Sequence, residues 1–153
     1  MKVLVDSCVW SLSLRRRTGA EDLKPQERLL LALLTDSIQD GRAVLLGPVR
    51  QEVLSGVRNA EQFEKLDQSL ALFPDQPIQP DDYVQAARLD CLCRRRGVQC
   101  GAVDMLLCAV AMRNEWTILT NDAGLLRCIE VIERELISEE ERMRGRKLSE
   151  VDW

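Results

Sequence analysis

Short apolar runs alternate with longer stretches of helical periodicity along most of this chain. Continuous apolar runs are typical of strands that are covered on both faces, and three stand out, at residues 3–5, 43–47 and 116–120. A weaker run at residues 129–132 predicts a last, edge strand. Apolar residues at helical spacing predict helices between the strands, at residues 7–17, 25–40, 48–57, 60–70, 82–96 and 101–114.

Strands that alternate with helices predict an α/β fold with three layers, in which helices cover both faces of a central, mainly parallel sheet of roughly four to five strands. The length of 153 residues fits one domain, which we expect to span residues 1–135. Residues 136–153 contain an acidic block, Glu139 to Glu141, followed by basic residues, and have little to bury. We therefore expect them to form a charged C-terminal extension.

The predicted helix at residues 25–40 is rich in leucine. A stripe with helical spacing runs along it, and Leu31 lies off that stripe. The stripe consists of Leu29, Leu30, Leu33, Leu34 and Ile38. Core packing is the simpler interpretation of this stripe, and docking of a partner helix is the alternative.

The composition, 46% hydrophobic and 30% charged, is typical of a globular protein. No apolar run reaches the roughly 20 residues of a membrane-spanning helix, and the start of the chain lacks the pattern of a secretory signal. We therefore expect a cytoplasmic protein without membrane contact. The six cysteines include no C-x-x-C pair and have mainly apolar neighbours, which favours reduced, buried thiols over disulfides or a zinc site.

Histidine is absent from the sequence. This excludes Ser-His-Asp and Cys-His catalysis, a histidine general base and imidazole ligands for zinc or iron. The glycine-rich motifs of dinucleotide-binding and P-loop proteins are also absent. Any catalysis must therefore use carboxylates, hydroxyls, thiols, Lys, Arg or a bound ion, and ligation by oxygen alone favours Mg²⁺ or Mn²⁺.

Four acids lie where a predicted strand ends or a predicted helix begins: Asp6, Glu52, Asp104 and Asp122. In a parallel α/β sheet these places converge on one edge, so we expect the four carboxylates to form a cluster. Crowded carboxylates repel one another unless a cation neutralises them, which predicts a divalent metal site. The alternative for Asp104 is a simple favourable charge in the first turn of its helix.

The segments around these acids resemble the PIN-domain ribonucleases, and among them the VapC-type toxins of bacterial toxin–antitoxin pairs. The resemblance covers residues 1–132 and rests on four pieces of sequence. These are Val3 to Ser7, Glu52 in the helix after the second strand, residues 104–111, and Leu119 to Asp122. The chain departs from the family pattern at Cys8, where Ser or Asn is common, and at Gly124-Leu125, where Asp-Phe often follows the last acid.

The resemblance implies a PIN-like fold and a Mg²⁺- or Mn²⁺-dependent endoribonuclease that hydrolyses RNA phosphodiester bonds. Asp6 and Asp104 are the implied principal metal ligands, and Asp122 completes the set. Glu52 is expected to orient the attacking water or to hold a second ion. Side chains expected to hydrogen-bond these carboxylates are those of Ser7, Thr120 and Asn121. The resemblance also implies a cognate antitoxin, bound along the helices of the toxin, and a toxin homodimer.

The net charge of −4 is unusual for a protein that binds RNA, but local basic patches control phosphate contact. Two groups of arginines are predicted to border the acidic cluster: Arg15, Arg16 and Arg17 after the first strand, and Arg50 and Arg58 on either side of Glu52. The alternative is that these arginines are ordinary solvated residues.

Two other functions compete with the ribonuclease interpretation. A catalytically weak PIN-like module that binds RNA or protein predicts the loss of one of the acids, and all four are present. A phosphatase of the haloacid dehalogenase kind needs a second Asp two residues after the first, where this chain has Cys8. The ribonuclease interpretation is therefore the one we adopt.

Overall fold

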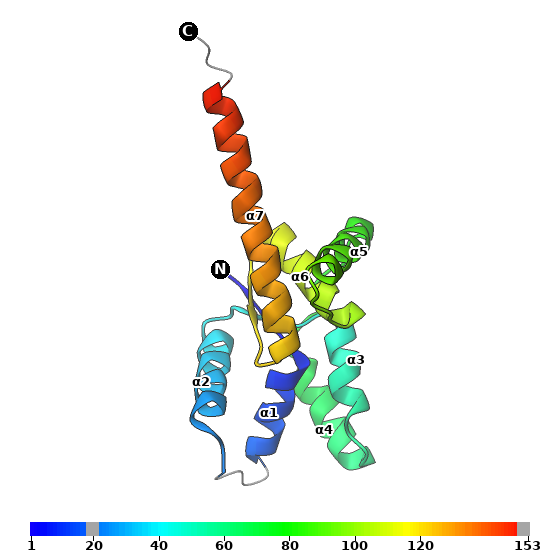
Figure 1. The fold of residues 1–153 in the computed structure, drawn as a ribbon. Coiled ribbons are helices and arrows are strands. Elements are labelled where there is room, and N and C mark those ends of the chain that lie inside the picture. Colours follow the sequence, from blue (N-terminus) through cyan, green and yellow to red (C-terminus); the bar gives the residue numbers. More distant parts are fainter. Residues whose placement is uncertain (18–21, 150–153) are drawn as a thin grey trace.

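The computed structural model describes the backbone of residues 1–17 and 22–149, and the side chains of residues 1–14 and 22–144. Within these residues, short strands alternate with helices (Figure 1). The elements are β1 (Val3–Val5), α1 (Ser7–Arg17), α2 (Pro25–Gln39), β2 (Ala43–Val44), α3 (Gly47–Ser55), α4 (Ala60–Leu70), α5 (Pro80–Arg95), α6 (Ala102–Asn114), β3 (Thr117–Leu119) and α7 (Ala123–Ser149).

The sheet is parallel, with the strand order β2-β1-β3. Leu4 of the central strand pairs with Val44 on one side and with Ile118 on the other. Helices flank the sheet, so the predicted α/β class is confirmed. The predicted number of strands was too high, because the described part of the chain contains a sheet of three strands.

The predicted edge strand at residues 129–132 is wrong, because these residues belong to α7. Leu125, Cys128 and Ile132 are buried at helical spacing along one face of this helix. The apolar run at this position was too short to distinguish a strand from a buried helical segment. In the structure the helix continues through the run and into the polar residues beyond it, as far as Ser149.

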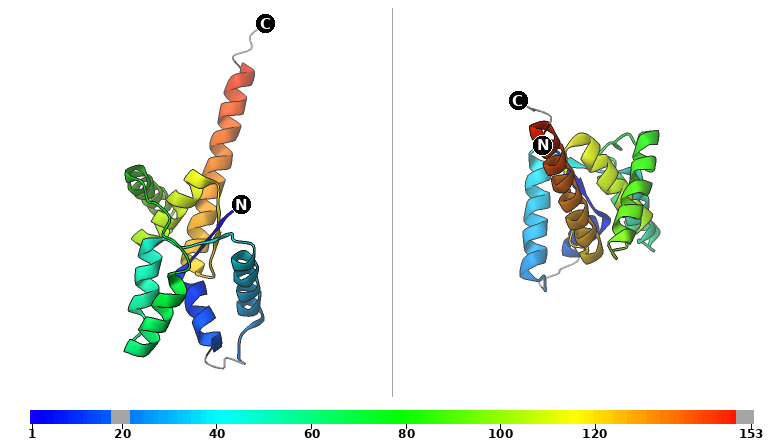
Figure 2. Two further views of the ribbon diagram at one scale, coloured as in Figure 1. Left: turned by 180° about the vertical axis from the view of Figure 1, so that it is seen from behind. Right: turned by 45° about the horizontal axis from the view of Figure 1, so that its top comes forward.

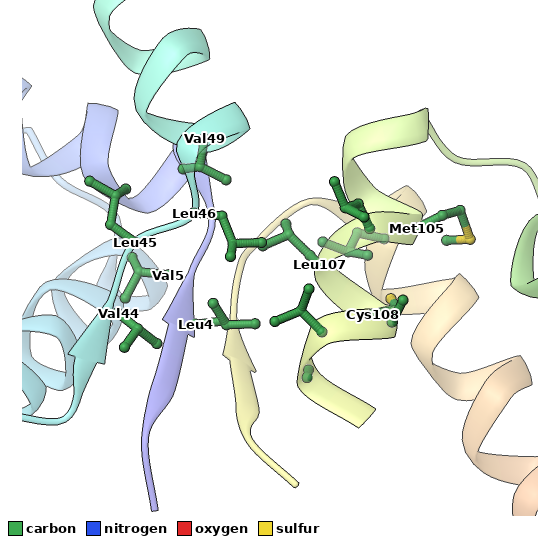
Figure 3. Packing of buried hydrophobic residues seen from close by; sticks show 14 of the residues in the cluster. Leu4, Val5, Val44, Leu45, Leu46, Val49, Met105, Leu107 and Cys108 are labelled. Atoms are coloured by element: carbon green, nitrogen blue, oxygen red, sulfur yellow. The ribbon is translucent and has the colours of Figure 1, made fainter. Parts of the chain in front are cut away.

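The core is built around β1, whose three residues are all buried. Figure 3 shows Leu4 on the side of the sheet that faces α6, where Leu107 lies, and Val5 near Leu45 on the other side. Successive strand residues point to opposite faces of a sheet, so a strand covered on both faces must be apolar at every position. Full burial of each such side chain contributes about 1.5–3 kcal/mol to stability.

The leucine-rich helix α2 packs differently from the prediction. Leu31 and Leu34 are buried, whereas Leu29, Leu33 and Ile38 are exposed to 61%, 43% and 40%. The predicted stripe was therefore wrong as a core face, except at Leu34 and the partly buried Leu30. The burial face is rotated by about one residue from it, and an apolar surface is left open to solvent.

Two of the six cysteines are joined, because the structure places a disulfide between Cys100 and Cys128. The prediction that all thiols are reduced is therefore wrong for this pair. The remaining thiols, those of Cys8, Cys91, Cys93 and Cys108, are free.

Helix α7 packs on the rest of the molecule with its first half, and its second half extends away from it (Figures 1 and 2). Ile132 is the last residue of α7 among the buried core residues. The division of the chain into a domain at residues 1–135 and an extension at residues 136–153 remains a prediction. No helix among the described residues is both long and apolar enough to cross a membrane.

Candidate active site at the carboxyl ends of the strands

Asp6 follows β1 directly and comes just before α1. Its backbone N–H continues the sheet by donating to the Leu119 carbonyl at 3.0 Å, which fixes Asp6 next to the end of β3. The side chain is only 4% exposed, and its Oδ1 accepts the N–H of Ser7 at 2.8 Å. A carboxylate is thus buried at the sheet edge with charge-assisted hydrogen bonding at the start of a helix.

The Thr120 hydroxyl is the second polar group of this edge. It donates to Asp6 Oδ2 at 2.8 Å and accepts the backbone N–H of Asp122 at 3.1 Å. Because Val5 pairs with Leu119, the residues that follow each strand are neighbours across the sheet. The parallel register therefore places Asp6 beside Thr120. This closeness allows the Thr120 hydroxyl to hydrogen-bond the Asp6 carboxylate.

Asp122 precedes α7, and its Oδ1 accepts the N–H of Leu125 at 2.7 Å, which stabilises the first turn of the helix. Gly124 lies against this carboxylate, since a Cβ at Gly124 would be 3.2 Å from Asp122 Oδ1. The departure from the family pattern at Gly124 thus coincides with a tight contact. A larger residue at this position would have to displace the carboxylate.

Asp104 lies in the first turn of α6, where its Oδ2 accepts the N–H of Gly101 at 3.2 Å. Burial raises the pKa of this carboxyl, and the charge of Asp6 raises the pKa further, with smaller contributions from Asp122 and Glu52. The hydrogen bond from Gly101 acts in the opposite direction. Four acids that are far apart in the sequence are thus close enough for Asp104 to be influenced by the other three.

Glu52 lies on α3 with an exposed side chain, and among the three other acids its charge raises the pKa of Asp104 least. The electrostatic influence on Asp104 falls in the order Asp6, Asp122, Glu52. The predicted role of Glu52, to orient a water or hold a second ion, remains a prediction.

Cys8 also belongs to this site, although the sequence marked it only as a departure from the family pattern. Its Sγ is 3.5 Å from both Asp6 Oδ2 and Thr120 Oγ1. Burial raises the pKa of the Cys8 thiol, and the Asp6 charge contributes to the increase. The thiol is therefore neutral near neutral pH and can act as a weak hydrogen-bond donor to the carboxylate. In the sequence, the position of Cys8 two residues after Asp6 was the feature that could have indicated its place in the site.

The two other predicted supporting residues behave differently from Thr120. Ser7 donates its backbone N–H to Asp6, so its contribution does not need the hydroxyl. Asn121 is exposed, and its backbone hydrogen bond to Cys8 lowers the pKa of that thiol. A side-chain role for either residue remains a prediction.

The predicted phosphate-binding arginines divide into three cases. Arg50 donates to Asp75 at 2.8 Å, to the Leu70 carbonyl at 3.0 Å and to the Phe73 carbonyl, so its guanidinium ties α3 to the segment after α4. Arg58 is exposed. The side chains of Arg15, Arg16 and Arg17 lie outside the described residues.

Carboxylate oxygens are the right ligands for Mg²⁺ or Mn²⁺, and the mutual repulsion at Asp104 is what a divalent cation relieves. Among the described residues, however, no three acidic or cysteine side chains are arranged as a closed metal-binding group. Asp6, Asp104 and Asp122 each use one oxygen at the start of a helix. A carboxylate has about four acceptor positions, so each of the three retains an acceptor position for a cation.

This chain resembles known proteins both in its sequence family and in its fold. The family model described as the PIN domain matches residues 3–130. FitAcB from Neisseria gonorrhoeae has a similar structure, with a TM-score of 0.63 and 22% identity over 84% of this chain and 93% of that one. FitAB bound to an IR36 DNA fragment gives a TM-score of 0.63 and 21% identity, over 84% and 90% of the two chains. No curated protein matches this chain.

Proposed function

Because this chain belongs to the PIN-domain family, we propose that it is a divalent-metal-dependent endoribonuclease that hydrolyses RNA phosphodiester bonds in the cytoplasm. One observation supports this most strongly. Asp6, Asp122 and Glu52 all raise the pKa of Asp104, so the four acids share one electrostatic environment. Such a cluster at the carboxyl ends of parallel strands suits metal-assisted hydrolysis, and it needs no histidine.

Asp6, Asp104 and Asp122 are the residues that would hold Mg²⁺ or Mn²⁺. When bound, the ion supplies an activated water and neutralises charge that develops on the phosphate. Contacts within the protein hold these carboxylates in position. Thr120 holds Asp6 and the backbone of Asp122 in a fixed relation, and Gly101 orients Asp104. Glu52, which is exposed on α3, would orient the attacking water or hold a second ion.

We further propose that the protein is the toxin of a toxin–antitoxin pair, of the VapC type, and that it forms a homodimer. The exposed Leu29, Leu33 and Ile38 on α2 give an antitoxin an apolar surface to cover. An amphipathic helix of the antitoxin could bind such a surface through residues three and four positions apart. The apolar face of α2 that the sequence assigned to the core is then a partner surface.

A cleavage assay with purified protein tests the nuclease. Cellular RNA is incubated with the protein in Mg²⁺, in Mn²⁺ and in EDTA, alongside Asp104→Asn and the control Asp67→Asn, which changes an exposed acid on α4. We expect cleavage with either ion by the wild type and the control, and at least a roughly hundredfold loss in EDTA or with Asp104→Asn. Equal cleavage in all samples would contradict the metal-dependent mechanism. Binding of RNA without cleavage would favour the alternative of a binding module.

A further inference from the structure

The Cys100–Cys128 disulfide joins the segment before α6, the helix that carries Asp104, to α7, the helix that follows Asp122. Cys100 precedes Gly101, the residue whose N–H orients the Asp104 carboxylate on α6. Cys128 is in the second turn of α7, the helix that begins directly after Asp122. The bond closes a loop over a sequence separation of 28 residues that contains Asp104 and Asp122.

Other contacts support the closeness of these two segments. Cys100 Sγ is 3.3 Å from the Gly124 carbonyl oxygen, and a Cβ at Gly124 would be 4.0 Å from the Gln99 carbonyl oxygen. Gly124 also lies against the Asp122 carboxylate. A movement of residues 99–101 relative to α7 would therefore reach both Asp104 and Asp122.

The pair is chemically accessible from one side. Cys100 is partly exposed and lines a groove between α5 and α6, together with Tyr83, Ala87 and Asp90. Cys128 is fully buried, and the Cys93 thiol is 3.9 Å from its carbonyl oxygen. A small thiol or disulfide can thus react first with Cys100. The buried Cys128 can then displace it from the Cys100 sulfur.

We propose that Cys100 and Cys128 are a reversible redox pair that controls the affinity of the acidic site for a divalent cation. In the oxidised form the bond holds the loop before α6 against α7, and the hydrogen bonds of Asp104 and Asp122 stay in place. In the reduced form this loop is free to separate from α7, and the carboxylates are less well oriented. The part of the proposal that concerns the cation rests on the proposed function.

The oxidant is a low-molecular-weight disulfide, RSSR. The Cys100 thiolate attacks one sulfur of RSSR, forms a mixed disulfide and releases RS⁻. The Cys128 thiolate then attacks the Cys100 sulfur and releases the second RS⁻. Two electrons pass from the protein to RSSR, and the two protons from the cysteines end on the two released RSH molecules.

Thiol labelling tests the pair itself. Full-length protein is reduced, exposed to glutathione disulfide, denatured, labelled with N-ethylmaleimide and analysed by mass spectrometry with peptide mapping. We expect the reduced protein to label at all six cysteines and the oxidised protein to lose the labels at Cys100 and Cys128. Cys91→Ser, which changes an exposed cysteine on α5, should form the same bond, whereas Cys100→Ser should not.

Titration with Mn²⁺ tests the coupling. We expect the oxidised wild type and the oxidised Cys91→Ser to bind Mn²⁺ about tenfold more tightly than their reduced forms, which is the low end of the effect of groups that orient metal ligands. Cys100→Ser should bind like the reduced wild type in both conditions. Cys128→Ala also lacks the bond and serves as a second variant in case Cys100→Ser unfolds the protein. Circular dichroism verifies the fold of each variant.

Full labelling of Cys100 and Cys128 after oxidation, or a bond mapped to other cysteines, would overturn the redox pair. Equal Mn²⁺ affinity of the two forms, with the bond present, would overturn the coupling. Absence of Mn²⁺ binding in both forms would contradict the proposed function and the coupling together, while the labelling result would still stand for the pair.

Discussion

The Thr120 hydroxyl connects two acids that the chain supplies from different strands. Thr120 is 8% exposed, and its hydroxyl donates to Asp6 while it accepts from the backbone of Asp122. A buried polar group costs free energy unless it is hydrogen-bonded, and here one hydroxyl satisfies two partners. Its removal therefore affects stability as well as the orientation of the acids.

We predict that Thr120→Val lowers the free energy of unfolding by about 1–3 kcal/mol, because a valine of nearly the same shape leaves the Asp6 oxygen and the Asp122 N–H without this partner. Urea denaturation followed by circular dichroism measures the change. Thr120→Ser keeps the hydroxyl and should lower the free energy of unfolding much less. Equal stability of the valine variant and the wild type would show that water replaces the hydroxyl.

Asp104 gives a prediction about pH. Its folded-state pKa is raised above the ordinary value of 3.8, so the folded protein holds this proton more tightly than the unfolded chain does. Its favourable contribution is fully present below pH 3.8 and is lost as the pH rises through the folded-state pKa. Asp104→Asn cannot ionise and should therefore be more stable than the wild type at pH 7 without divalent ions.

Thermal unfolding of the two proteins from pH 3 to pH 8 in EDTA measures this difference. We expect it to grow with rising pH and to shrink when saturating Mg²⁺ is added, because the ion offsets the repulsion in the wild type alone. Asp67→Asn, the exposed control on α4, should follow the wild type throughout. A wild type that is more stable than Asp104→Asn at pH 7 in EDTA would contradict the electrostatic argument.

An ion pair between a buried carboxylate and an exposed arginine links helices α5 and α6. Arg113 of α6 donates two hydrogen bonds of 2.8 Å to Asp82, which lies in the first turn of α5, and a third of 3.1 Å to the Pro77 carbonyl. The Asp82 side chain is 3% exposed. The Arg113 guanidinium lowers the pKa of Asp82, so the pair stabilises the fold above the ordinary pKa of 3.8 and this stability is lost as the pH falls through the folded-state pKa.

We predict that Arg113→Met lowers the free energy of unfolding at pH 7 by about 1–3 kcal/mol, because the buried Asp82 carboxylate loses the hydrogen bonds of a charged partner that is itself partly exposed to solvent. The loss should diminish in acid, where Asp82 is protonated. Arg95→Met, at the exposed end of α5, is the control and should change the free energy by less than about 0.5 kcal/mol. Chemical denaturation at pH 7 and at pH 3 makes the comparison, and an equal loss at both values would argue against an ionic contribution.

Element boundaries show where a local pattern is insufficient. The strands β1 and β3 and the helices α1 and α4 were predicted close to their observed limits. Continuous apolar runs mark the two strands, and the apolar residues of α4 recur at helical spacing. The run at residues 129–132 satisfies both patterns. Its assignment to α7 depends on which neighbours cover Cys128 and Ile132, and this is not a property of the segment itself.

The protein as a whole consists of a body and a helix that extends beyond it (Figure 2). From Glu139 to Arg144 every residue of α7 is exposed to solvent, and Met143 is 56% exposed. An isolated helical segment of this length adds little stability of its own in water. We therefore predict that a chain truncated after Ser138 keeps its fold, with a free energy of unfolding within about 0.5 kcal/mol of the full chain.

Thermal unfolding and circular dichroism of the truncated chain test this prediction of the domain limits. The helical signal should fall only by the share of the residues removed. Truncation after Cys128, which also removes the buried Ile132, is the contrasting variant and should unfold. A large loss of stability on truncation after Ser138 would show that the extension belongs to the body or to an interface.

The sequence by itself determined the fold class and the four acids of the candidate site. Hydrophobic periodicity is a local property, and the parallel arrangement brings the carboxyl ends of the strands to one edge whatever the details of packing. The absence of histidine likewise restricted the chemistry, because composition alone excludes every mechanism that needs an imidazole. These conclusions needed only residue type, order and spacing.

Tertiary structure alone decided the features that depend on how distant segments meet. It showed Arg50 bound to the segment after α4, Cys8 beside Asp6, and Cys100 joined to Cys128. It also rotated the buried face of α2, which leaves Leu29 exposed. The physical reason is common to all of these. A side chain's partner is set by the packing of whole elements in three dimensions, which the local pattern of apolar and polar residues does not encode.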